Sequence, residues 1–383
     1  MGAIEEEQGF VYVGGRKLRR GYTTGSCATA ASKAAAQMLL SGETVGSVDI
    51  MTPRGIPLHI PIEKIEIGDG VVSCAVRKDG GDDADDTNGA YIHSRVRRSD
   101  EYGVHIDGGI GVGRVTRKGL DQPPGNAAIN HVPRNMITEC VEDVCGALGY
   151  AGGIDVEIYV PEGETIAKRT FNSRLGIIGG ISILGTSGIV EPMSETALLG
   201  SIKAEMKMFM AQGRRYLLTV PGNYGKDFVR AYPALEGQQP VECSNFIGDF
   251  LDMALELDAK GVLLVGNLGK LVKLAGGIMN THSRNADSRM EILASNAILA
   301  GADTDMARRI MDCVSTDDAL EVLAEKDLVK PVMDILIPKI EFHMNHRVKG
   351  DLEVAAIVFS SEFGILGQTP SADRLLGKVG ARE

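Results

Sequence analysis

The feature that most constrains the fold of this chain is a unit that recurs in its second half. A short apolar run is followed by a loop containing glycine and then by a helical segment, at residues 181–211, 216–225 and 262–270. Apolar runs that alternate with helices predict parallel strands, with the connecting helices packed on the faces of the sheet. A further strand is predicted at residues 353–359, at or near the edge of the same sheet.

The helices of the second half can also be placed from the sequence. Ser244 is expected to cap a helix over residues 245–257, and several helices are expected between residues 287 and 347. Another helix is expected from about Ser194 to residue 211. A parallel sheet with helices on its faces is therefore the predicted architecture of this half.

The first half of the chain has a different pattern. Residues 26–40 are rich in alanine, and Gly42 ends this predicted helix. Pro133 is expected to open a second helix that runs to about residue 148. Turn signals separate short strand-like runs, which predicts hairpins of antiparallel strands. These strands are expected at residues 47–51, 56–60, 64–67, 71–77, 90–96, 103–106, 114–116 and 154–160.

The two patterns predict an α+β half and an α/β half. The chain has 383 residues, and a domain usually has about 100–200, so two domains are expected. We place the boundary near residue 165. The predicted domains are an N-terminal one, residues 1–165, with a largely antiparallel sheet, and a C-terminal one, residues 166–383, with a parallel sheet.

Charge and cysteine usage exclude several classes of protein. The chain has 40 Lys and Arg against 51 Asp and Glu, a formal net charge of −11, which argues against a nucleic-acid partner and a polybasic membrane surface. Six scattered cysteines without a C-x-x-C pair fit free thiols in a reducing compartment. No secretory signal or membrane span is visible. We expect a cytoplasmic protein with no membrane partner.

An acidic loop follows the predicted strand at residues 71–77. It reads KDGGDDADDTNG, and its candidate catalytic residues are Asp79, Asp82, Asp83 and Asp85. Runs of charge are usually solvated loops, and that interpretation stays open. Mg²⁺ binding, stabilisation of a cationic ligand and general-base catalysis also stay open, whereas an EF-hand fails on its sixth and twelfth positions.

The loops after the predicted parallel strands are candidates for cofactor binding. Ligands of open parallel sheets bind beyond the carboxyl ends of the strands, where glycine permits close backbone approach. The alternative is that these loops are ordinary tight turns. The candidate residues are Gly185, Thr186, Ser187, Gly188, Pro221, Gly222 and Asn223, with a third loop at residues 266–270.

Residues before the alanine-rich helix are candidates for binding an anionic substrate. Thr24 or Ser26 is expected to cap the helix, and with Thr23 they offer hydroxyl groups near the basic Arg19 and Arg20. Capping alone is the alternative. A second basic and polar cluster follows the third predicted strand of the second half, at Lys270, Lys273 and His282.

Other motifs are weaker indicators of function. Residues 107–113 read D-G-G-I-G-V-G, which is similar to a nucleotide loop, but no helix is predicted after them, so a glycine-rich turn is the better interpretation. No H-E-x-x-H or zinc spacing is present, and no protein-held metal is expected. A kinase or dehydrogenase is disfavoured because G-x-x-x-x-G-K-[ST] and a well-placed G-x-G-x-x-G are missing.

Long motifs spread over residues 16–360 resemble those of the cobalt-precorrin-5B (C-1)-methyltransferase family. They include RRGYTTGSCATAASKAA, KDGGDDADDTNGA, GGIGVGRVTRKGL, PPGNAAIN, FNSRLGIIGGISILGTSGIVEPMSE and GKLVKLAGGIMNTHSR. The resemblance implies an enzyme that moves a methyl group from S-adenosylmethionine to carbon 1 of cobalt-precorrin-5B, giving cobalt-precorrin-6A, in anaerobic cobalamin biosynthesis. It also implies a substrate-binding α+β domain and a cofactor-binding, Rossmann-like three-layer α/β domain.

The resemblance has further implications for ligands. Cobalt would belong to the substrate, a polycarboxylate corrin precursor, and the product would pass on to neighbouring pathway enzymes. The macrocycle is expected against residues 23–27 and the aspartate loop, with Asp83 or a neighbour as proton acceptor. Asn88 and Asn267 stand where the family pattern often has histidine, so a histidine role at those positions is excluded. A non-catalytic corrinoid carrier remains the alternative.

Overall fold

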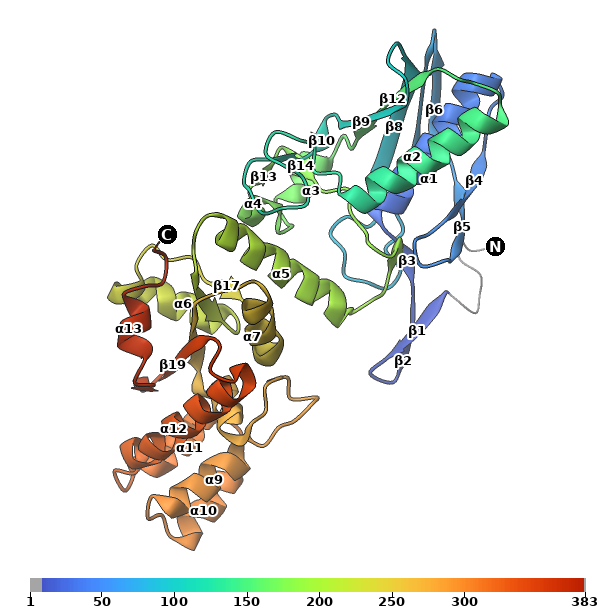
Figure 1. Ribbon diagram of the computed structural model, residues 1–383. Helices are drawn as coiled ribbons and strands as arrows, with labels where there is room; N and C mark the ends of the chain where they lie inside the picture. The colour runs from blue at the N-terminus through green and yellow to red at the C-terminus, as the bar shows by residue number, and fades with distance from the viewer. Residues whose placement is uncertain (1–8, 382–383) are drawn as a thin grey trace. The chain divides into compact units, whose positions relative to one another are not determined.

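The chain forms two compact units, which are described separately. The computed structural model describes residues 9–381 (Figure 1), and the boundary between the units lies between Glu195 and Thr196. The expected boundary near residue 165 differs from this division. The segment that follows residue 165 joins the first unit because it supplies three short strands that pair there, β13 (Ile177–Ile178), β14 (Gly180–Ile181) and β15 (Ile189–Val190).

A five-stranded sheet organises the first unit. Its spatial order is β6 (Glu63–Gly68), β7 (Val71–Arg77), β8 (Tyr91–Ser99), β12 (Gly153–Tyr159) and β9 (Val104–Gly108). The first four strands pair antiparallel, and β9 pairs parallel with β12. A separate hairpin joins β4 (Ser47–Met51) to β5 (Pro57–Pro61). The predicted antiparallel character of this half is confirmed.

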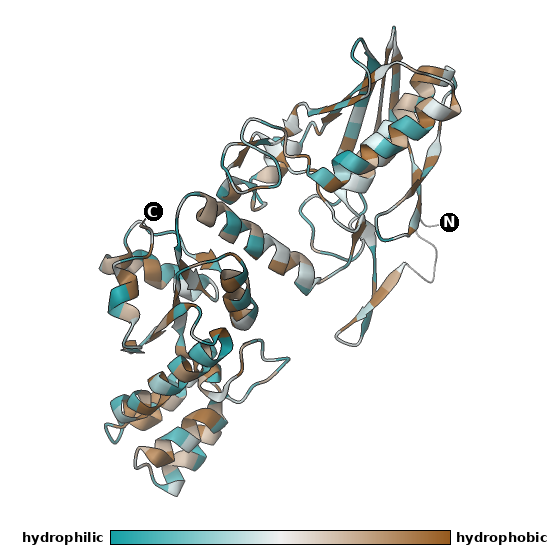
Figure 2. Ribbon diagram, in the orientation of Figure 1, coloured by the Kyte–Doolittle hydropathy of each residue, from teal (hydrophilic) through white to brown (hydrophobic). Residues whose placement is uncertain are grey.

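Two long helices share one hydrophobic core with this sheet. In α1 (Thr24–Ser41) 13 of 18 residues are buried, and most of these are small, so the helix lies close to the sheet. Ser32 Oγ of α1 lies 2.9 Å from Ser94 Oγ of β8. The second helix, α2 (His131–Ala147), runs beside α1 (Figure 1) and buries residues spaced three or four apart. In Figure 2 hydrophilic and hydrophobic residues alternate along this helix.

The ends of these helices differ in part from expectation. Gly42 ends α1 in a left-handed conformation, as predicted. The N-cap of α1 is Thr23, however, and neither Thr24 nor Ser26, because Thr23 alone precedes the helix with an extended backbone. Helix α2 begins at His131, so Pro133 is its third residue and not its first. A proline in the first turn leaves no intrahelical bond unmade.

Short strands complete the first unit. Strand β3 (Gly21–Tyr22) pairs with β15, β10 (Gly111–Val112) with β14, and β11 (Arg114–Val115) with β13, while β1 (Phe10–Val13) and β2 (Arg16–Arg19) form a hairpin. The expectation that residues 181–184 open the parallel sheet of the second half is therefore wrong. A short apolar run has no periodicity that reveals its partner, and this one pairs with the first half.

The second unit contains the predicted parallel sheet. Its order is β17 (Val241–Glu242), β16 (Tyr216–Val220), β18 (Gly261–Asn267), β19 (Glu353–Ser360) and β20 (Gly364–Gln368). The first four strands are parallel, and β20 is antiparallel to β19. The predicted strand at residues 353–359 is thus one place in from the edge, because β20 lies outside it.

Successive residues of the strands contribute to separate cores on opposite faces of this sheet. Val262 and Leu264 belong to a large core, whereas Leu263 and Val265 belong to a smaller one. The smaller core is covered by α6 (Asn223–Ala231) and α13 (Ala372–Leu376). The larger core holds α5 (Glu195–Ala211), α7 (Ile247–Glu256), α9 (Arg289–Leu299), α10 (Thr304–Met311), α11 (Thr316–Ala324) and α12 (Val329–Val348).

Local details of the second unit follow from its packing. Helix α7 starts at Ile247, and six of its ten residues are buried. The N-cap is Phe246, so the expected cap at Ser244 is wrong; Ser244 has a left-handed backbone with φ 54°. Short helices include α3 (Gly163–Ala167), α4 (Asn172–Leu175) and α8 (Leu268–Leu271), with 3₁₀ turns at η1 (Pro233–Leu235) and η2 (Val272–Gly276). Among residues 9–381 no helix has the length and apolarity to cross a membrane.

The winding of the second sheet determines where a ligand can bind. From β16 the chain crosses to β17 on one side, and from β18 it crosses to β19 on the other side. The connections that follow the adjacent strands β16 and β18 therefore lead to opposite sides of this strand pair. In open α/β sheets such a point leaves a crevice outside the carboxyl ends of the strands, where ligands bind.

Candidate active site

The aspartate loop, residues 78–89, is bound through its backbone to the chain that leads into α1. The Tyr22 N–H donates to the Asp79 carbonyl at 2.9 Å, and the Asp82 N–H donates to the Arg19 carbonyl at 2.9 Å. A Cβ at Gly21 would lie only 2.3 Å from the carbonyl carbon of Gly80. Glycine is therefore required at position 21 for the two backbones to touch.

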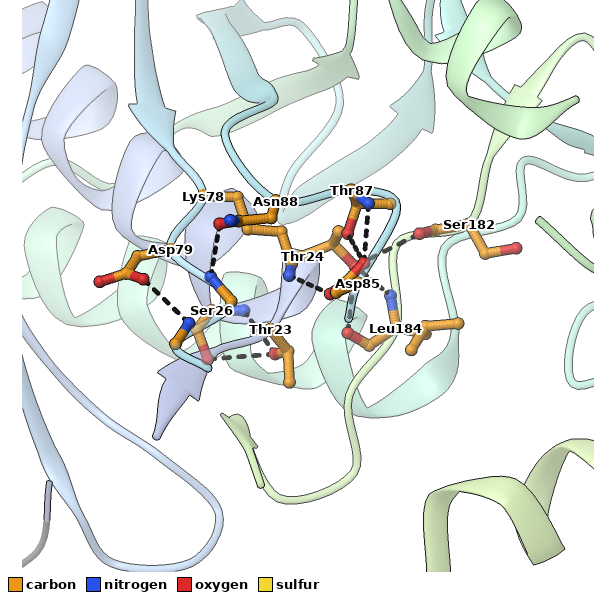
Figure 3. A network of polar contacts seen from close by, with 12 residues as sticks. Thr23, Thr24, Ser26, Lys78, Asp79, Asp85, Thr87, Asn88, Ser182 and Leu184 are labelled. Carbon is orange, nitrogen blue, oxygen red and sulfur yellow. Dashed lines mark hydrogen bonds and ion pairs between the residues drawn. The ribbon is translucent and has the colours of Figure 1, made fainter. Parts of the chain in front are cut away.

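Two of the four candidate catalytic aspartates have both oxygens engaged. Arg19 donates to Asp79 at 2.5 and 2.7 Å, and this contact keeps the pKa of Asp79 low despite partial burial. Burial raises the pKa of Asp85, but Lys78 and two bonds from Thr87, at 2.7 and 2.5 Å, outweigh it and lower the pKa (Figure 3). Carboxylates of low pKa are weak proton acceptors, so Asp79 and Asp85 act as supports of the loop.

Asp82 and Asp83 are placed differently. Asp82 Oδ2 accepts from the Arg19 N–H at 2.6 Å, and Asp83 Oδ1 accepts from the Met193 N–H at 3.0 Å. Within the described residues the second oxygen of each carboxylate has no hydrogen-bond partner. These two aspartates, out of the four candidates, therefore keep an oxygen available to a ligand.

The hydroxyls predicted to bind substrate instead join α1 to a distant segment. Thr23 Oγ1 accepts from the Ser26 N–H at 3.2 Å, as an N-cap does. Thr24 Oγ1 accepts from the Leu184 N–H at 3.0 Å (Figure 3). Ser26 Oγ donates to the Gly188 carbonyl at 2.7 Å. Binding of substrate by these side chains stays a prediction, but their main contacts are structural.

The glycine loop, residues 185–188, lies in the first unit and not at the rim of the parallel sheet. A Cβ at Gly185 would lie 2.3 Å from Thr23 Oγ1, and one at Gly188 would lie 2.8 Å from Thr52 Cβ. Ser187 Oγ bonds within the loop to Ile189, while Thr186 is exposed. The seven residues predicted to bind cofactor thus divide between the units, with Gly185, Thr186, Ser187 and Gly188 in the first and Pro221, Gly222 and Asn223 in the second.

In the second unit, the loops after β16 and β18 meet at the switch point. Lys270 Nζ donates to the Pro221 carbonyl at 2.6 Å, which joins the two loops directly. Gly222 has φ 150°, and a Cβ there would face Lys270 Nζ at 3.8 Å and Glu242 Oε1 at 4.0 Å. A ligand above Gly222 would therefore meet a cation, a carboxylate and the start of α6 at Asn223.

The chemistry of this rim is electrostatic. Burial lowers the pKa of Lys270, while Cys243 and Glu242 oppose the shift. Burial raises the pKa of the Cys243 thiol to about 11, so it stays protonated and is no nucleophile at neutral pH. Glu242 is ion-paired with Lys226 of α6. The rim is suited to holding a small molecule that carries both charges.

The other two predicted substrate residues differ from each other in accessibility. Lys273 is buried, and its Nζ donates to the carbonyls of Thr281 at 3.1 Å and Ala286 at 2.8 Å. Its ammonium therefore holds residues 281–287 in place. His282 is exposed on that segment, and its Nδ1 accepts from the Arg284 N–H at 3.0 Å. A ligand contact by His282 stays a prediction.

Sequence reasoning missed several residues of these sites. Glu242 ends a strand of only two residues, which has no recognisable pattern. Ser360, at the carboxyl end of β19, donates to Asp317 Oδ1 at 2.6 Å. Lys78 is buried beside Asp85, and its place directly before the aspartates was the available signal. In the described part of the chain no group of three or more His, Cys, Asp or Glu is arranged to hold a metal ion.

The switch point of the parallel sheet brings Lys270 and Glu242 together beside Gly222, and the chain also carries a carboxylate loop held by backbone hydrogen bonds. This arrangement is typical of a small-molecule-binding protein of mixed α/β class. The particular family follows from sequence comparison. The chain belongs to the CbiD family, which it matches over residues 11–192, and it matches the CbiD C-terminal domain over residues 280–370.

Curated relatives cover nearly the whole chain. A protein of Ruminiclostridium cellulolyticum is 46% identical over 351 residues, 92% of this chain and 91% of its own length. One of Alkaliphilus metalliredigens is 45% identical over 367 residues, 96% of each chain. Both are named cobalt-precorrin-5B C(1)-methyltransferase. A crystal structure of the cobalamin biosynthesis protein cbiD from Archaeoglobus fulgidus is 29% identical, covers 73% of this chain and 88% of its own, and has a TM-score of 0.40.

Proposed function

We propose that this protein is a cobalt-precorrin-5B C(1)-methyltransferase, which moves a methyl group from S-adenosylmethionine to carbon 1 of the macrocycle and gives cobalt-precorrin-6A. The observation that carries the proposal is the high identity, 45–46% over more than nine tenths of the chain, to two relatives named for this reaction. Cobalamin biosynthesis by the anaerobic route is then the pathway, and the cobalt ion is part of the substrate.

The second unit, as a Rossmann-like three-layer domain, would bind the methyl donor. S-adenosylmethionine ends in an amino acid that carries an ammonium and a carboxylate. Over Gly222, Lys270 is suited to the carboxylate and Glu242 to the ammonium or to the ribose hydroxyls. The absence of a side chain at Gly222 leaves the space that this group would fill. The fold rule for switch points supports the same location.

Little covalent help from the protein is needed. The S–CH₃ bond of the sulfonium breaks with its electrons passing to sulfur, while an electron-rich ring carbon forms the new C–C bond. Alignment of the two reactants and exclusion of water supply the acceleration, and effective molarities reach ~10⁵–10⁸ M in such cases. The buried Cys243 thiol has no role as a nucleophile in this scheme.

The first unit would then bind the macrocycle and take up a proton as the ring conjugation readjusts. Asp82 and Asp83 support this role because each keeps one oxygen unbonded, whereas Asp79 and Asp85 do not. We expect Asp83→Asn or Asp82→Asn to lower kcat by about 10²-fold, in the range of a positioned general base. Full turnover in both variants would exclude the role.

The reaction is tested by anaerobic incubation of the purified protein with cobalt-precorrin-5B and methyl-labelled S-adenosylmethionine, followed by mass spectrometry. We expect one labelled methyl group at carbon 1 and one equivalent of S-adenosylhomocysteine. Tight binding of the macrocycle by folded protein without any transfer of label would instead identify a corrinoid carrier.

A further inference from the structure

The guanidinium of Arg134 is held in one orientation by the backbone. Arg134 lies in the first turn of α2 and is half-buried. Its Nε donates to the carbonyl of Ile129 at 2.8 Å, and its Nη1 donates to the carbonyl of Ile106 in β9 at 2.9 Å. Because these carbonyls belong to two separate segments, the plane of the guanidinium is fixed before any ligand binds.

This cation has no carboxylate partner within the described part of the chain. Both oxygens of the nearby Asp107 are bonded to Arg114, at 2.7 and 2.9 Å. Asp121 is bonded to His131 and Gln122. Burial lowers the pKa of Arg134, and Arg114 adds to this effect, while Asp107 and Asp121 oppose it. Folding has thus removed a cation partly from water without pairing it, which costs free energy that a bound anion would recover.

One edge of the guanidinium remains open. An arginine side chain has five N–H donors, and the two backbone carbonyls occupy two of them. Nη2 has no protein partner in the described residues, and it is not among the unpartnered polar atoms that are closed off from solvent. A planar pair of donors in a fixed plane matches a carboxylate in two-point contact.

The residue before Arg134, Pro133, packs against the first turn of α1. A Cβ on Gly25 would come within 2.8 Å of Pro133 Cγ and 3.1 Å of the Leu184 carbonyl, so the first turns of α1 and α2 touch. The two helices run side by side in Figure 1. Their positive dipole ends therefore lie together, and each of them favours an anion. The aspartate loop is hydrogen-bonded to Arg19 and Tyr22, which precede the same turn of α1 in the chain.

We propose that Arg134 binds a carboxylate of the macrocyclic substrate and so selects for acetate and propionate side chains that are free carboxylates over side chains that are esterified. This inference rests on the proposed function and adds a substrate-binding residue that lies outside both the aspartate loop and the rim of the second unit. Arg134 orients the macrocycle over the first turns of α1 and α2 and takes no part in the transfer of the methyl group.

The test measures binding and turnover separately with Arg134→Gln. Anaerobic absorption titration gives the Kd for cobalt-precorrin-5B, and steady-state methyl transfer gives KM and kcat. We expect Kd and KM to rise about 10- to 100-fold, as for loss of a charge-assisted contact, with kcat within about threefold and the Kd for S-adenosylhomocysteine unchanged. The matched control is Arg97→Gln, since Arg97 is 65% exposed and has its own partner, Asp155. Its constants are expected to equal those of the wild type.

A second variant covers the case in which Arg134→Gln does not fold. Arg134→Lys keeps the charge but loses the planar two-point contact, and we expect Kd to rise roughly 3- to 10-fold. Methyl esterification of the macrocycle should weaken binding to wild type and leave binding to Arg134→Lys less affected. A Kd equal to that of Arg97→Gln in the folded Arg134 variant would overturn the subsite. Failure of the wild type itself to methylate or bind the macrocycle would overturn the proposed function instead.

Discussion

Among single residues of the first unit, Lys78 is a cation that is almost fully buried. Its side chain is 2% exposed, and its ammonium is paired with Asp85, whose side chain is 22% exposed. Removing one partner of a buried pair leaves an uncompensated charge, which typically costs more than the pair itself contributes. The pair therefore fixes the aspartate loop more than it adds to net stability.

We expect Lys78→Met to lower the free energy of unfolding by about 3–5 kcal/mol, because Asp85 would be left without its cation. The double variant Lys78→Met/Asp85→Asn should lose less than the sum of the two single changes. Urea denaturation followed by circular dichroism measures both. Lys330→Met is the control, since Lys330 is 82% exposed and paired with Asp334 on a helix surface, and its effect should stay within about 0.5 kcal/mol. Equal losses in the two single lysine variants would contradict the argument.

His93 on β8 gives the fold a dependence on pH. The residue is 7% exposed, and its ring stacks on Tyr159 with the ring centroids 4.6 Å apart. Both ring nitrogens are buried without a hydrogen-bond partner in the described residues. Burial lowers its pKa below the ordinary 6.5; Lys64 and Arg95 lower it further, while Glu66 opposes the shift. The unfolded chain therefore takes up a proton at this site before the folded chain does. Stability contributed by neutral His93 is present above pH 6.5 and is lost as the pH falls below it.

We expect His93→Phe to reduce the loss of stability between pH 7.5 and pH 5.5, because phenylalanine keeps the stacking and cannot bind a proton. Denaturation midpoints at several pH values measure the slope. The control, His59→Gln, alters a side chain that is 61% exposed and should keep the wild-type slope. An unchanged slope in His93→Phe would mean that His93 does not titrate differently on folding.

At the scale of elements, the contact between β3 and the aspartate loop depends on glycine at position 21 and at position 81. Gly21→Ala would place a Cβ 2.3 Å from Gly80 and 2.4 Å from the Asp79 carbonyl, and backbone cannot yield as a flexible side chain does. We expect a loss of stability of about 1–3 kcal/mol and a fall in methyl transfer of about 10²-fold from the displaced loop. Thermal melting and the labelled-methyl assay measure the two effects.

Gly46→Ala is the matched control for this change, because a Cβ there has no atom within 4 Å and the backbone needs no positive φ. It should leave melting temperature and activity at wild-type values. If Gly21→Ala had the same melting temperature and methyl-transfer activity as Gly46→Ala, the loop would have to be adaptable. The close backbone contact would then not be needed for activity.

The elements also show what the sequence could predict. Strands β4 and β7 have the predicted bounds, because alternation or continuous apolar character over five to seven residues is visible in a single sequence. Pairs of two residues, such as β10 with β14, have no such signal. The glycine loop at residues 185–188 was assigned to the wrong sheet for this reason. The burial of Lys78 and Lys273 was not predicted, because burial depends on tertiary neighbours.

For the whole molecule, the two units should respond to different ligands. If the proposed function holds, S-adenosylhomocysteine should slow amide exchange in the rim loops of the second unit, residues 221–226 and 267–271. The macrocycle should slow exchange in residues 78–89 and in the first turns of α1 and α2. Hydrogen exchange with mass spectrometry distinguishes these patterns. Protection of the aspartate loop by S-adenosylhomocysteine alone would show that the ligands are assigned to the wrong units.

The acidic net charge of the whole chain excludes some classes of ligand but identifies none. A net charge of −11 argues against nucleic acid but not against a polycarboxylate, because Arg134 and Lys270 are local cations in fixed positions. Composition averages over such groups. Their significance depends on which carbonyls and carboxylates surround them, and a single sequence does not contain that information.

The first turn of α1 has a consequence for how the protein is made. Its bonds from Leu184 to Thr24 and from Ser26 to Gly188 span 160 and 162 residues. Ribosomes deliver a chain from its N-terminus at about 5–20 residues per second, so α1 leaves the ribosome roughly 8–32 s before these partners. During synthesis the first turn of α1 therefore lacks these hydrogen bonds until residues 184–188 have been made. Any pause in translation before residue 188 prolongs the exposure of this turn to solvent.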